Sequence, residues 1–200
     1  MTRTVGLYLF DDVEVLDFAG PYEVFSTASR VQSRLDPQSP MLFEVVTIAD
    51  DKRIVCARGG LKVLPDVEIT AHPHLDVLVI PGGIVTAELK RDGIIDWIAR
   101  TASTTQITAS VCTGAFLLGK AGLLKGKPAT THWEDLDDFH SMFPEIRVQA
   151  EARWVDVGQI MTSAGISAGI DMSLHLVSRL ESQELAVKTA RQMEYDWQVL

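Results

Sequence analysis

The sequence predicts one α/β domain, in which an open and mostly parallel sheet is covered by helices on both faces. The first observation is that short apolar runs, each suited to a buried strand, alternate with helical stretches along the chain. The second is that the runs at 75–80 and 107–111 are apolar almost throughout, as strands buried on both faces are. The third is the length of 200 residues, which suits a single domain and which no repeat or linker divides. We therefore treat residues 1–200 as one domain.

The N-terminal part of the chain is expected to form two strands, one helix and an excursion at the sheet edge. Residues 5–10 suit the first strand. Pro21 suits the first position of a helix that runs to about Arg30, because its fixed φ is helical and its missing N–H has no partner there. Cys56 is expected in the core or in edge packing. The other expected elements are a loop at 32–40, a strand at 43–49 and an antiparallel excursion with strands at 54–56 and 61–64.

The C-terminal part is expected to alternate strands and helices. An apolar stripe at helical spacing marks a helix at 93–103. The acidic stretch at 133–143 predicts a helix with a solvated face, which Pro144 ends. A long helix opens with small residues at 163–169 and runs to 180, and a terminal helix covers 183–196. The remaining elements are strands at 75–80, 107–111, 129–132, 147–150, 153–157 and 160–162, and helices at 86–89 and 115–118.

The stretch 106–119 has the pattern of a strand, a sharp turn and a helix, with Cys112 at the turn. The small residues Ser110 and Gly114 flank it, as in the Gly-x-Ser-x-Gly elbow that exposes the nucleophile of hydrolases. A cysteine at this place lies beside a helix N-terminus, whose N–H groups and dipole favour the thiolate and hold an anion formed during reaction. The alternative is a buried structural cysteine after a core strand.

Two further segments also follow predicted parallel strands. Asp17 follows the first strand among apolar neighbours, which favour a carboxyl that keeps its proton. Gly82 and Gly83 follow the strand at 75–80, where glycines let the backbone approach a ligand with N–H groups. Taken alone, Asp17 equally fits a loop or capping carboxylate, and the glycines equally fit a plain turn. Because the carboxyl ends of parallel strands meet at one edge of the sheet, the three segments together favour a cysteine-centred site there.

The composition excludes several classes of function. The chain is 46% hydrophobic and 22% charged, with a net charge of −9, which disfavours nucleic acid and anionic membranes as partners. No apolar run approaches the roughly 20 residues that cross a bilayer, and the N-terminus suits a strand rather than a signal peptide. Two cysteines and five scattered histidines do not have the spacing of a zinc site. The sequence therefore predicts a reduced, cytoplasmic protein without a metal.

Five segments form a set of motifs that resembles the ThiJ/PfpI superfamily, whose fold is class I glutamine amidotransferase-like. They are LDFAGPYEVF at 16–25, VIPGG at 79–83, SVCTGA at 110–115, GLLKGKPATTHW at 122–133 and TSAG at 162–165. Within the superfamily the segments are most similar to isonitrile hydratases (isocyanide hydratases) and to the sensor domains of AraC-type transcription regulators. The resemblance covers nearly the whole chain.

The resemblance implies a flavodoxin-like three-layer sandwich and a homodimer, with no cofactor and no metal. It implies that Cys112 is the nucleophile of a lyase, and that Asp17 lies beside the thiol as general acid and base. Thr113 matches the Cys-Thr pair of the hydratases, and its hydroxyl would orient water or substrate. Protease-like members carry a histidine at that position, so peptide hydrolysis is disfavoured.

The backbone at Gly82, Gly83 and Gly114 is expected to bind the substrate or a developing negative charge. His132 is a distant candidate for a replacement base, and we expect it to have a structural role.

The expected reaction is hydration of an isonitrile, a small neutral electrophile, to an N-substituted formamide through a thioimidate on Cys112. One alternative is a glyoxalase-like enzyme that modifies a carbonyl group. Another is a non-enzymatic sensor of small molecules or of redox state. A DNA-binding regulator would continue with a basic helix-turn-helix domain, whereas this sequence stops at Leu200.

Overall fold

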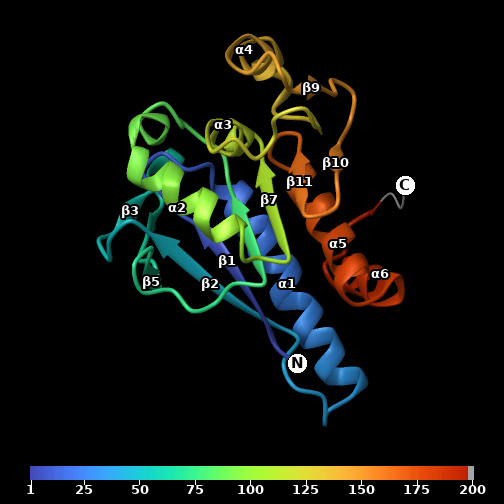
Figure 1. Cartoon of the computed structure of the whole chain (residues 1–200). Helices are drawn as coiled ribbons and strands as arrows, with labels where there is room; N and C mark the ends of the chain where they lie inside the picture. Colours follow the sequence, from blue (N-terminus) through green and yellow to red (C-terminus); the bar gives the residue numbers. More distant parts are fainter. Residues whose placement is uncertain (198–200) are drawn as a thin grey trace.

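A seven-stranded sheet forms the centre of the protein in its computed structural model, which describes residues 1–197 (Figure 1). The strand order is β10-β11-β7-β6-β1-β2-β5, and β10 alone among these strands runs antiparallel to its neighbour. This arrangement confirms the predicted mostly parallel sheet. The strands are β1 (Arg3–Tyr8), β2 (Phe43–Ala49), β5 (Val67–Glu68), β6 (Val77–Ile80), β7 (Ile107–Val111), β10 (Trp154–Asp156) and β11 (Ile160–Ser163).

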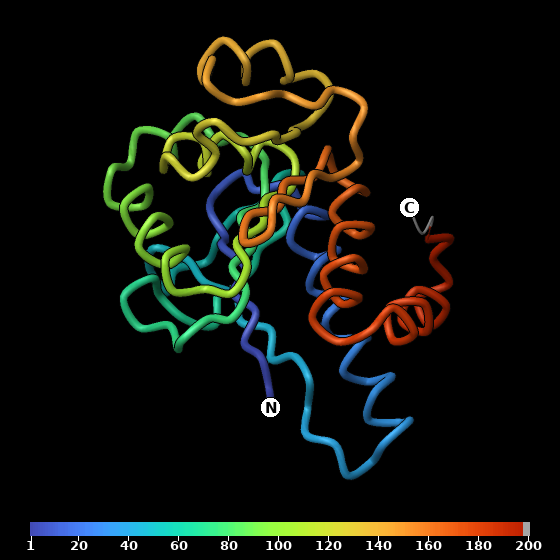
Figure 2. Tube along the Cα trace, turned by 45° about the vertical axis from the view of Figure 1, so that its right-hand side comes forward, coloured from blue at the N-terminus to red at the C-terminus, as the bar shows by residue number. Residues whose placement is uncertain are grey.

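Helices cover both faces of the sheet, as expected for a three-layer sandwich (Figure 2). One face carries α1 (Val15–Leu35), α5 (Ala168–Leu180) and α6 (Gln183–Gln192), which pack on one another. The other face carries α2 (Asp92–Ala102) and α3 (Gly114–Lys120). None of the helices within residues 1–197 is long and apolar enough to span a bilayer.

The two faces of the sheet bury separate apolar layers. Phe25 on α1 packs edge-on against Phe43 on β2, with ring centroids 5.1 Å apart. On the other face Phe116 on α3 packs against Phe139, with centroids 4.9 Å apart. Strands β6 and β7 lie in the middle of the sheet and are buried throughout, which explains why their sequences are apolar on both sides.

Helix α1 begins at Val15, so the prediction of a start at Pro21 is wrong. Pro21 lies inside the helix and removes the N–H that would bond to the carbonyl of Asp17. The helix tolerates this missing hydrogen bond because the turn before Pro21 packs on the core through Phe18, which is 7% exposed. As a result Asp17 lies in the first turn of α1 rather than in a loop before it.

The excursion between β2 and β6 differs from the prediction in its pairing. Strands β3 (Val55–Cys56) and β4 (Lys62–Val63) pair with each other in a separate two-stranded sheet. Cys56 is exposed there, so it is not a core residue. The edge of the main sheet is instead β5, which the sequence did not predict because only two residues pair. Asp66 fixes its register, since its carboxylate accepts hydrogen bonds from the N–H and hydroxyl of Thr47 at 2.8 and 2.6 Å.

Several elements are shorter than predicted. The terminal helix α6 ends at Gln192 because Glu194 adopts a left-handed conformation and the Tyr195 N–H bonds to the carbonyl of Ala190. A 3-10 turn at Glu88–Lys90 replaces the helix predicted at 86–89, and another at Trp133–Asp135 precedes α4 (Leu136–Met142), which was predicted to begin at 133. Helix α5 begins at Ala168 instead of 163. The strands predicted at 129–132 and 147–150 are reduced to a small parallel pair of β8 (Pro128–Ala129) with β9 (Arg147–Val148).

The order of the strands determines where the site lies. The chain leaves β1 to form β2 on one side and returns to form β6 on the other, so the strand order reverses at the β1–β6 pair. Ligand sites in such sheets lie beyond the carboxyl ends of the strands at this point. The segments that follow β1, β6 and β7 carry Asp17, the two glycines and Cys112, and they meet at this edge.

Candidate active site

Cys112 lies on the sharp turn between β7 and α3. Its φ of 56° is in the left-handed region, which a non-glycine residue adopts rarely and which often marks a functional site. Gly114 makes the turn sterically feasible, because a Cβ there would lie 2.1 Å from the carbonyl oxygen of Ile80. Cys112 is 7% exposed, so its sulfur is nearly enclosed. The sharp backbone turn is that of the predicted elbow, whereas the side chain is buried instead of exposed at the bend.

Hydrogen bonds with buried hydroxyl and carbonyl groups fix the backbone of the elbow. The Thr131 hydroxyl donates to the carbonyl of Cys112 at 2.9 Å, and the Cys112 N–H donates to the carbonyl of Ser163 at 3.2 Å. The N–H of Thr130 donates to the hydroxyl of Thr162 at 2.9 Å. These bonds fix the backbone on both sides of the left-handed residue, so the strained turn persists.

Asp17 is fully buried and shares the site with Cys112. Its Oδ2 accepts a hydrogen bond from the N–H of Gly82 at 2.9 Å, while no group within residues 1–197 bonds Oδ1 with ordinary geometry. Burial raises the pKa of the carboxyl to about 7, and the charge of Glu14 adds to the rise. The Gly82 N–H and the neighbouring Cys112 thiol act in the opposite direction. The carboxyl therefore changes protonation state near neutral pH, as a general acid and base must.

The Cys112 thiol differs from the expectation of a favoured thiolate. Burial, followed by the negative charge of Asp17, raises its pKa to about 12. The backbone N–H groups of Thr113 and Ile166 hydrogen-bond the sulfur and lower the pKa, but by less. Helix α3 is short, so its N-terminus does not outweigh burial beside a carboxylate. The resting sulfur is therefore a thiol, and it needs a neighbouring base to become a nucleophile.

Gly82, Gly83 and Thr113 pack closely, but the two glycine N–H groups already have partners. The Thr113 hydroxyl accepts from the Gly83 N–H and donates to the Gly83 carbonyl, both at 2.9 Å. The Gly82 N–H holds Asp17, and a Cβ on Gly82 would lie 2.6 Å from the Thr113 backbone nitrogen and 2.9 Å from Asp17 Oδ2. These glycines therefore position the acid and the threonine instead of offering free donors, and Gly114 serves packing.

Ile166 is the site residue that the sequence analysis missed. It lies in the loop before α5 with a φ of 51°, an unfavourable conformation for a β-branched residue. This conformation directs its N–H at the Cys112 sulfur. An isoleucine carries no chemical signal for such a role, since the backbone performs it. The only sequence signal is the small-residue segment at 163–169, which indicates an unusual turn at the start of a helix.

His132 packs against this loop from the other side. A Cβ on Gly165 would lie 2.0 Å from the ring carbon Cδ2 of His132, so glycine is required for this contact. The ring nitrogen Nδ1 lies 3.3 Å from Asp135 Oδ2 and faces the start of α4. Its contacts are those of a residue that positions the loop. Within residues 1–197, no three His, Cys, Asp or Glu side chains gather in a way that would hold a metal ion.

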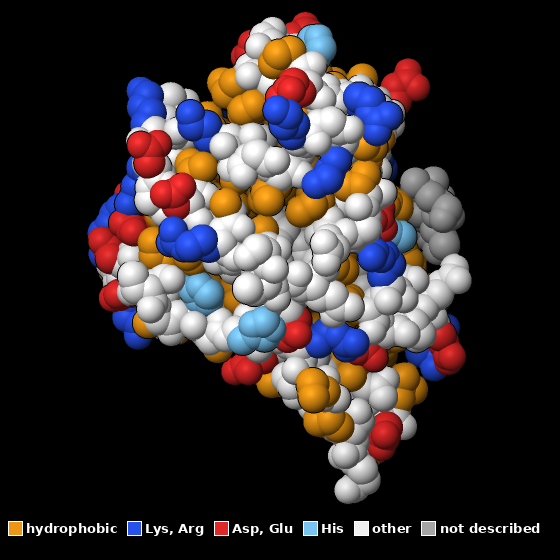
Figure 3. All heavy atoms as spheres, in the orientation of Figure 1, with side chains coloured by type: hydrophobic (Ala, Val, Ile, Leu, Met, Phe, Trp, Pro, Cys, Tyr) orange, Lys and Arg blue, Asp and Glu red, His pale blue; other side chains and the backbone are white. Residues whose placement is uncertain are grey.

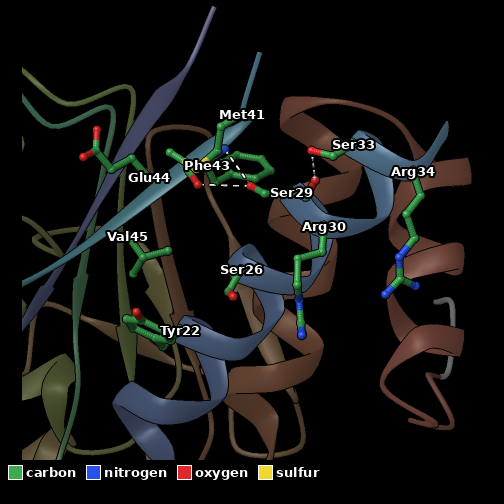
Figure 4. A pocket seen from close by; sticks show the side chains of 10 residues that line it. All are labelled: Tyr22, Ser26, Ser29, Arg30, Ser33, Arg34, Met41, Phe43, Glu44 and Val45. Carbon is green, nitrogen blue, oxygen red and sulfur yellow. Dashed lines mark hydrogen bonds between the residues drawn. The ribbon is translucent and has the colours of Figure 1, made fainter. Parts of the chain in front are cut away.

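Two pockets are relevant to the position of the site. One of about 700 Å³ adjoins the elbow and is lined by Gly83 and Thr113 among others. Another of about 570 Å³ lies between α1 and β2, and Tyr22, Arg30 and Glu44 are among the residues that line it (Figure 4). The second pocket contains none of the predicted site residues. Cys112 and Asp17 do not line either of these two pockets, and the first pocket adjoins the elbow through Thr113.

Comparisons with known proteins show the family of the chain. The sequence model of the DJ-1/PfpI family matches residues 3–179. The chain belongs to the DJ-1/PfpI family. One relative, the isonitrile hydratase of Pseudomonas putida, is 34% identical over 98% of this chain and 79% of its own length. Another, the HTH-type transcriptional regulator GbdR of Pseudomonas aeruginosa, is 27% identical over 97% of this chain and 51% of the regulator.

Solved structures place the chain in the same fold family. A ThiJ/PfpI family protein from Pseudomonas syringae aligns with a TM-score of 0.85 and 28% identity, over 100% of this chain and 77% of that chain. DJ-1beta of Drosophila melanogaster aligns with a TM-score of 0.83 and 19% identity, over 98% of this chain and 100% of that chain. The DJ-1/PfpI family thus includes an isonitrile hydratase and regulators among the relatives of this chain.

Proposed function

We propose that this DJ-1/PfpI protein is a lyase that hydrates an isonitrile to an N-substituted formamide. The observation that carries the proposal is the pairing of a left-handed elbow cysteine with a buried carboxyl whose pKa is about 7. The 34% identity to an isonitrile hydratase over nearly the whole chain supports the choice of substrate. The pairing by itself supports nucleophilic attack by sulfur with proton transfer through Asp17.

The first half of the proposed reaction forms a thioimidate. The Asp17 carboxylate accepts the thiol proton as the Cys112 sulfur attacks the terminal carbon of the isonitrile, R–N≡C. The carbon then takes this proton from Asp17, giving R–N=CH–S–Cys112. Because the thiol pKa is about 12, proton removal and S–C bond formation must occur together rather than through a stable thiolate. The N–H groups of Thr113 and Ile166 face the sulfur and stabilise the charge that develops on it.

The second half hydrolyses the thioimidate. Asp17, again ionised, takes a proton from a water molecule as the water oxygen attacks the same carbon, and passes that proton to the imine nitrogen, giving R–NH–CH(OH)–S–Cys112. As the C–S bond of this intermediate breaks, Asp17 takes the hydroxyl proton and gives it to the leaving sulfur, and R–NH–CHO is released. The sum is one isonitrile plus one water to one formamide, with both side chains restored.

The test is a turnover assay of the reduced protein with cyclohexyl isonitrile, in which formamide formation is measured. We expect hydration by the wild-type protein, its loss in Cys112→Ala and a loss of at least about a hundredfold in Asp17→Asn. Circular dichroism shows whether each variant is folded. The hydratase proposal fails if the folded, reduced wild-type protein produces no formamide. The assigned roles fail if either variant keeps the full rate.

The regulator relatives support a second candidate function, the binding of a small molecule without turnover. The same enclosed site would then act as a sensor, and Cys112 would react only with oxidants or ligands. Mass spectrometry after mild peroxide treatment, together with the absence of turnover on isonitriles and on methylglyoxal, would favour this candidate. Turnover of methylglyoxal alone would favour a glyoxalase-like enzyme.

The proposal extends to the compartment and the assembly. Both cysteines are free thiols, and a site that depends on a thiol needs a reducing compartment, so we propose the cytoplasm. We also propose a homodimer, as the family resemblance implies. Light scattering on the purified protein would test it, and the expected mass is twice that of the 22.0 kDa chain.

A further inference from the structure

A group of hydroxyl side chains lies beneath the elbow, in the layer between the sheet and α3. Ser110 on β7 and Thr162 on β11 are partners in register, and the two strands lie side by side (Figure 1). Paired residues of neighbouring strands project to the same face of a sheet, so both side chains lie on one face. Ile80, the partner of Ser110 on β6, belongs to the apolar layer that α3 covers. The two hydroxyls therefore lie in otherwise apolar surroundings.

Thr130 adds a third hydroxyl to this group. Its backbone N–H donates to the Thr162 hydroxyl at 2.9 Å, so the two residues are in contact. The next residue, Thr131, bonds the carbonyl of Cys112, and Ser110 precedes Cys112 by two residues. The exposed fractions of Ser110, Thr130 and Thr162 are 0%, 0% and 1%. The group is thus enclosed, and it lies between two segments that hold the backbone of Cys112.

Two of the three hydroxyls lack a hydrogen-bond partner in the described part of the chain. Neither Ser110 Oγ nor Thr130 Oγ1 bonds to any group of residues 1–197. Thr108, two residues before Ser110 on β7, differs because its hydroxyl pairs with that of Thr105 at 2.9 Å. A buried hydroxyl without a partner is costly, so native proteins pair such groups with protein atoms or with ordered water. The two oxygens therefore indicate a ligand that reaches them.

We propose that Ser110, Thr130 and Thr162 bind one ordered water molecule beneath the elbow. The ligand must be small, because the three side chains are enclosed and line neither of the pockets described above. It must be uncharged, because none of the three side chains carries a charge that would offset the cost of burying an ion. It must donate and accept hydrogen bonds, since hydroxyls do both. Water meets these conditions, and a buried water typically forms about three hydrogen bonds.

A crystal structure of the wild-type protein tests the site directly. The test needs no turnover, so its outcome does not depend on the proposed hydration. We expect electron density for one water within about 3.2 Å of at least two of the three hydroxyl oxygens. Direct bonds among the hydroxyls, formed by rotation of the side chains with no water between them, would overturn the proposal.

The sign of a stability change gives a second test. Ser110→Ala removes one partner of the water and leaves the Thr130 hydroxyl without a complete network. The midpoint of thermal unfolding should therefore fall by at least about 3 °C. If Ser110 Oγ has no partner at all, the same substitution removes an unpaired polar group from the interior, and the midpoint should stay the same or rise. An unchanged or higher midpoint would thus contradict the proposal.

A double-mutant cycle tests whether the hydroxyls share one water. Thr130→Val removes a second partner and keeps the branched shape of the side chain. The loss of unfolding free energy in the double variant Ser110→Ala, Thr130→Val, measured in urea, should be clearly smaller than the sum of the two single losses, because either substitution already disrupts the water. Additive losses for this pair would rule out a shared water.

Thr108→Val is the matched control for the cycle. The Thr108 hydroxyl bonds Thr105 directly and shares no partner with Thr130. Its loss of unfolding free energy should therefore add to that of Thr130→Val. Equal non-additivity in the control pair would show that the coupling spreads through the strand and not through a water, and would overturn the proposal.

Discussion

At the scale of single residues, the site depends on two groups whose protonation is coupled. Asp17 and Cys112 are both buried, and the Asp17 carboxylate raises the pKa of the thiol, so the pair holds at most one negative charge near neutral pH. The charge at rest belongs to Asp17, because the thiol pKa is about 12 and the carboxyl pKa is about 7. In the proposed reaction the Asp17 carboxylate is therefore the base that activates the thiol.

The raised pKa of Asp17 predicts a specific dependence of stability on pH. The folded carboxyl has a pKa of about 7 against an ordinary value of 3.8, so the folded state holds this proton more tightly. Its contribution to stability is fully present below about pH 3.8 and is lost as pH rises through 7. Asp17→Asn lacks this titration. The free energy of unfolding of the wild-type protein minus that of Asp17→Asn should thus fall by on the order of a few kcal/mol between pH 4 and 8.

Urea unfolding of both proteins at several pH values measures this difference, and other titrating groups cancel because both proteins share them. A difference that stays constant or rises with pH would show that the Asp17 carboxyl is ionised throughout the range. The proton transfers assigned to it would then have no basis.

A second residue-scale prediction concerns Thr113. Thr113→Val removes the hydroxyl that pairs with both backbone groups of Gly83, and leaves those groups unpaired beside Asp17 and the pocket. We expect kcat/KM for an isonitrile to fall by about tenfold or more, because small displacements of reacting groups are costly. Thr113→Ser keeps the hydroxyl and should stay within about threefold of wild type. Equal activity of the valine and serine variants would show that the hydroxyl positions nothing.

The sequence predicted the residues that carry chemical groups and missed the one that acts through its backbone. Cys112 and Asp17 could be found because a thiol and a carboxyl each follow a predicted strand, and the strands were predictable from their apolar runs. Ile166 could not be found in this way, because its contribution is a backbone N–H that a left-handed φ directs at the sulfur. The state of the thiol was predicted wrongly for a similar reason, because burial is a property of the folded chain.

At the scale of elements, hydrogen bonds between loops hold the three site segments in place. The Glu14 N–H donates to the carbonyl of Gly82 at 2.8 Å, and the Ile84 N–H donates to the carbonyl of Asp12 at 3.1 Å. Gly83 lies between them with a φ of 135°, and a Cβ there would lie 2.2 Å from the Asp12 carbonyl oxygen. The loop after β6 is thus joined to the residues that begin α1. These hydrogen bonds fix the position of Glu14, the residue directly before α1, and this explains why α1 starts before Pro21.

The start of α5 has its own anchor, which leads to an element-scale prediction. The Asp171 carboxylate, in the first turn of α5, accepts hydrogen bonds from the Arg153 guanidinium and, at 3.1 Å, from the Tyr195 hydroxyl. The carbonyl of Arg153 accepts the Ala164 N–H at 2.9 Å, so the network reaches the loop that carries Ile166. Asp171→Ala should lower the free energy of unfolding by about 1–3 kcal/mol and also reduce kcat/KM.

Asp156→Ala is the matched control for this prediction. Asp156 on β10 forms a comparable network with Arg179 and His175, at the same edge of the sheet but without a bond to the loop. It should cost stability and leave kcat/KM unchanged. Thermal unfolding and isonitrile turnover of both variants test the pair. A loss of activity in both variants, or in neither, would show that the Asp171 network does not position the loop.

At the scale of the whole molecule, the strand order could be only partly predicted. The alternation of strands and helices indicated a parallel sheet, and the placement of Asp17, Gly82 and Cys112 after strands indicated one shared edge. The pairing of β5 and of the small β3–β4 and β8–β9 sheets involves two residues per strand, which is too short for a hydrophobic pattern to mark. Those elements form because tertiary contacts hold them, and the sequence pattern alone gives no signal of that.

The charge of the whole molecule leads to a prediction about duplex DNA. Its net charge is −9, and on the face shown in Figure 3 the basic side chains are scattered among acidic and apolar ones. Affinity for duplex DNA comes largely from basic groups that displace counterions, and no such stripe is seen on this face. The chain spans about half of the regulator GbdR, so that protein has further length for another function.

We therefore predict that a labelled random duplex shows no change in fluorescence anisotropy with this protein, even at low ionic strength where non-specific binding is strongest. Binding that weakens steeply as salt is added would contradict the prediction and would favour the regulator over the enzyme.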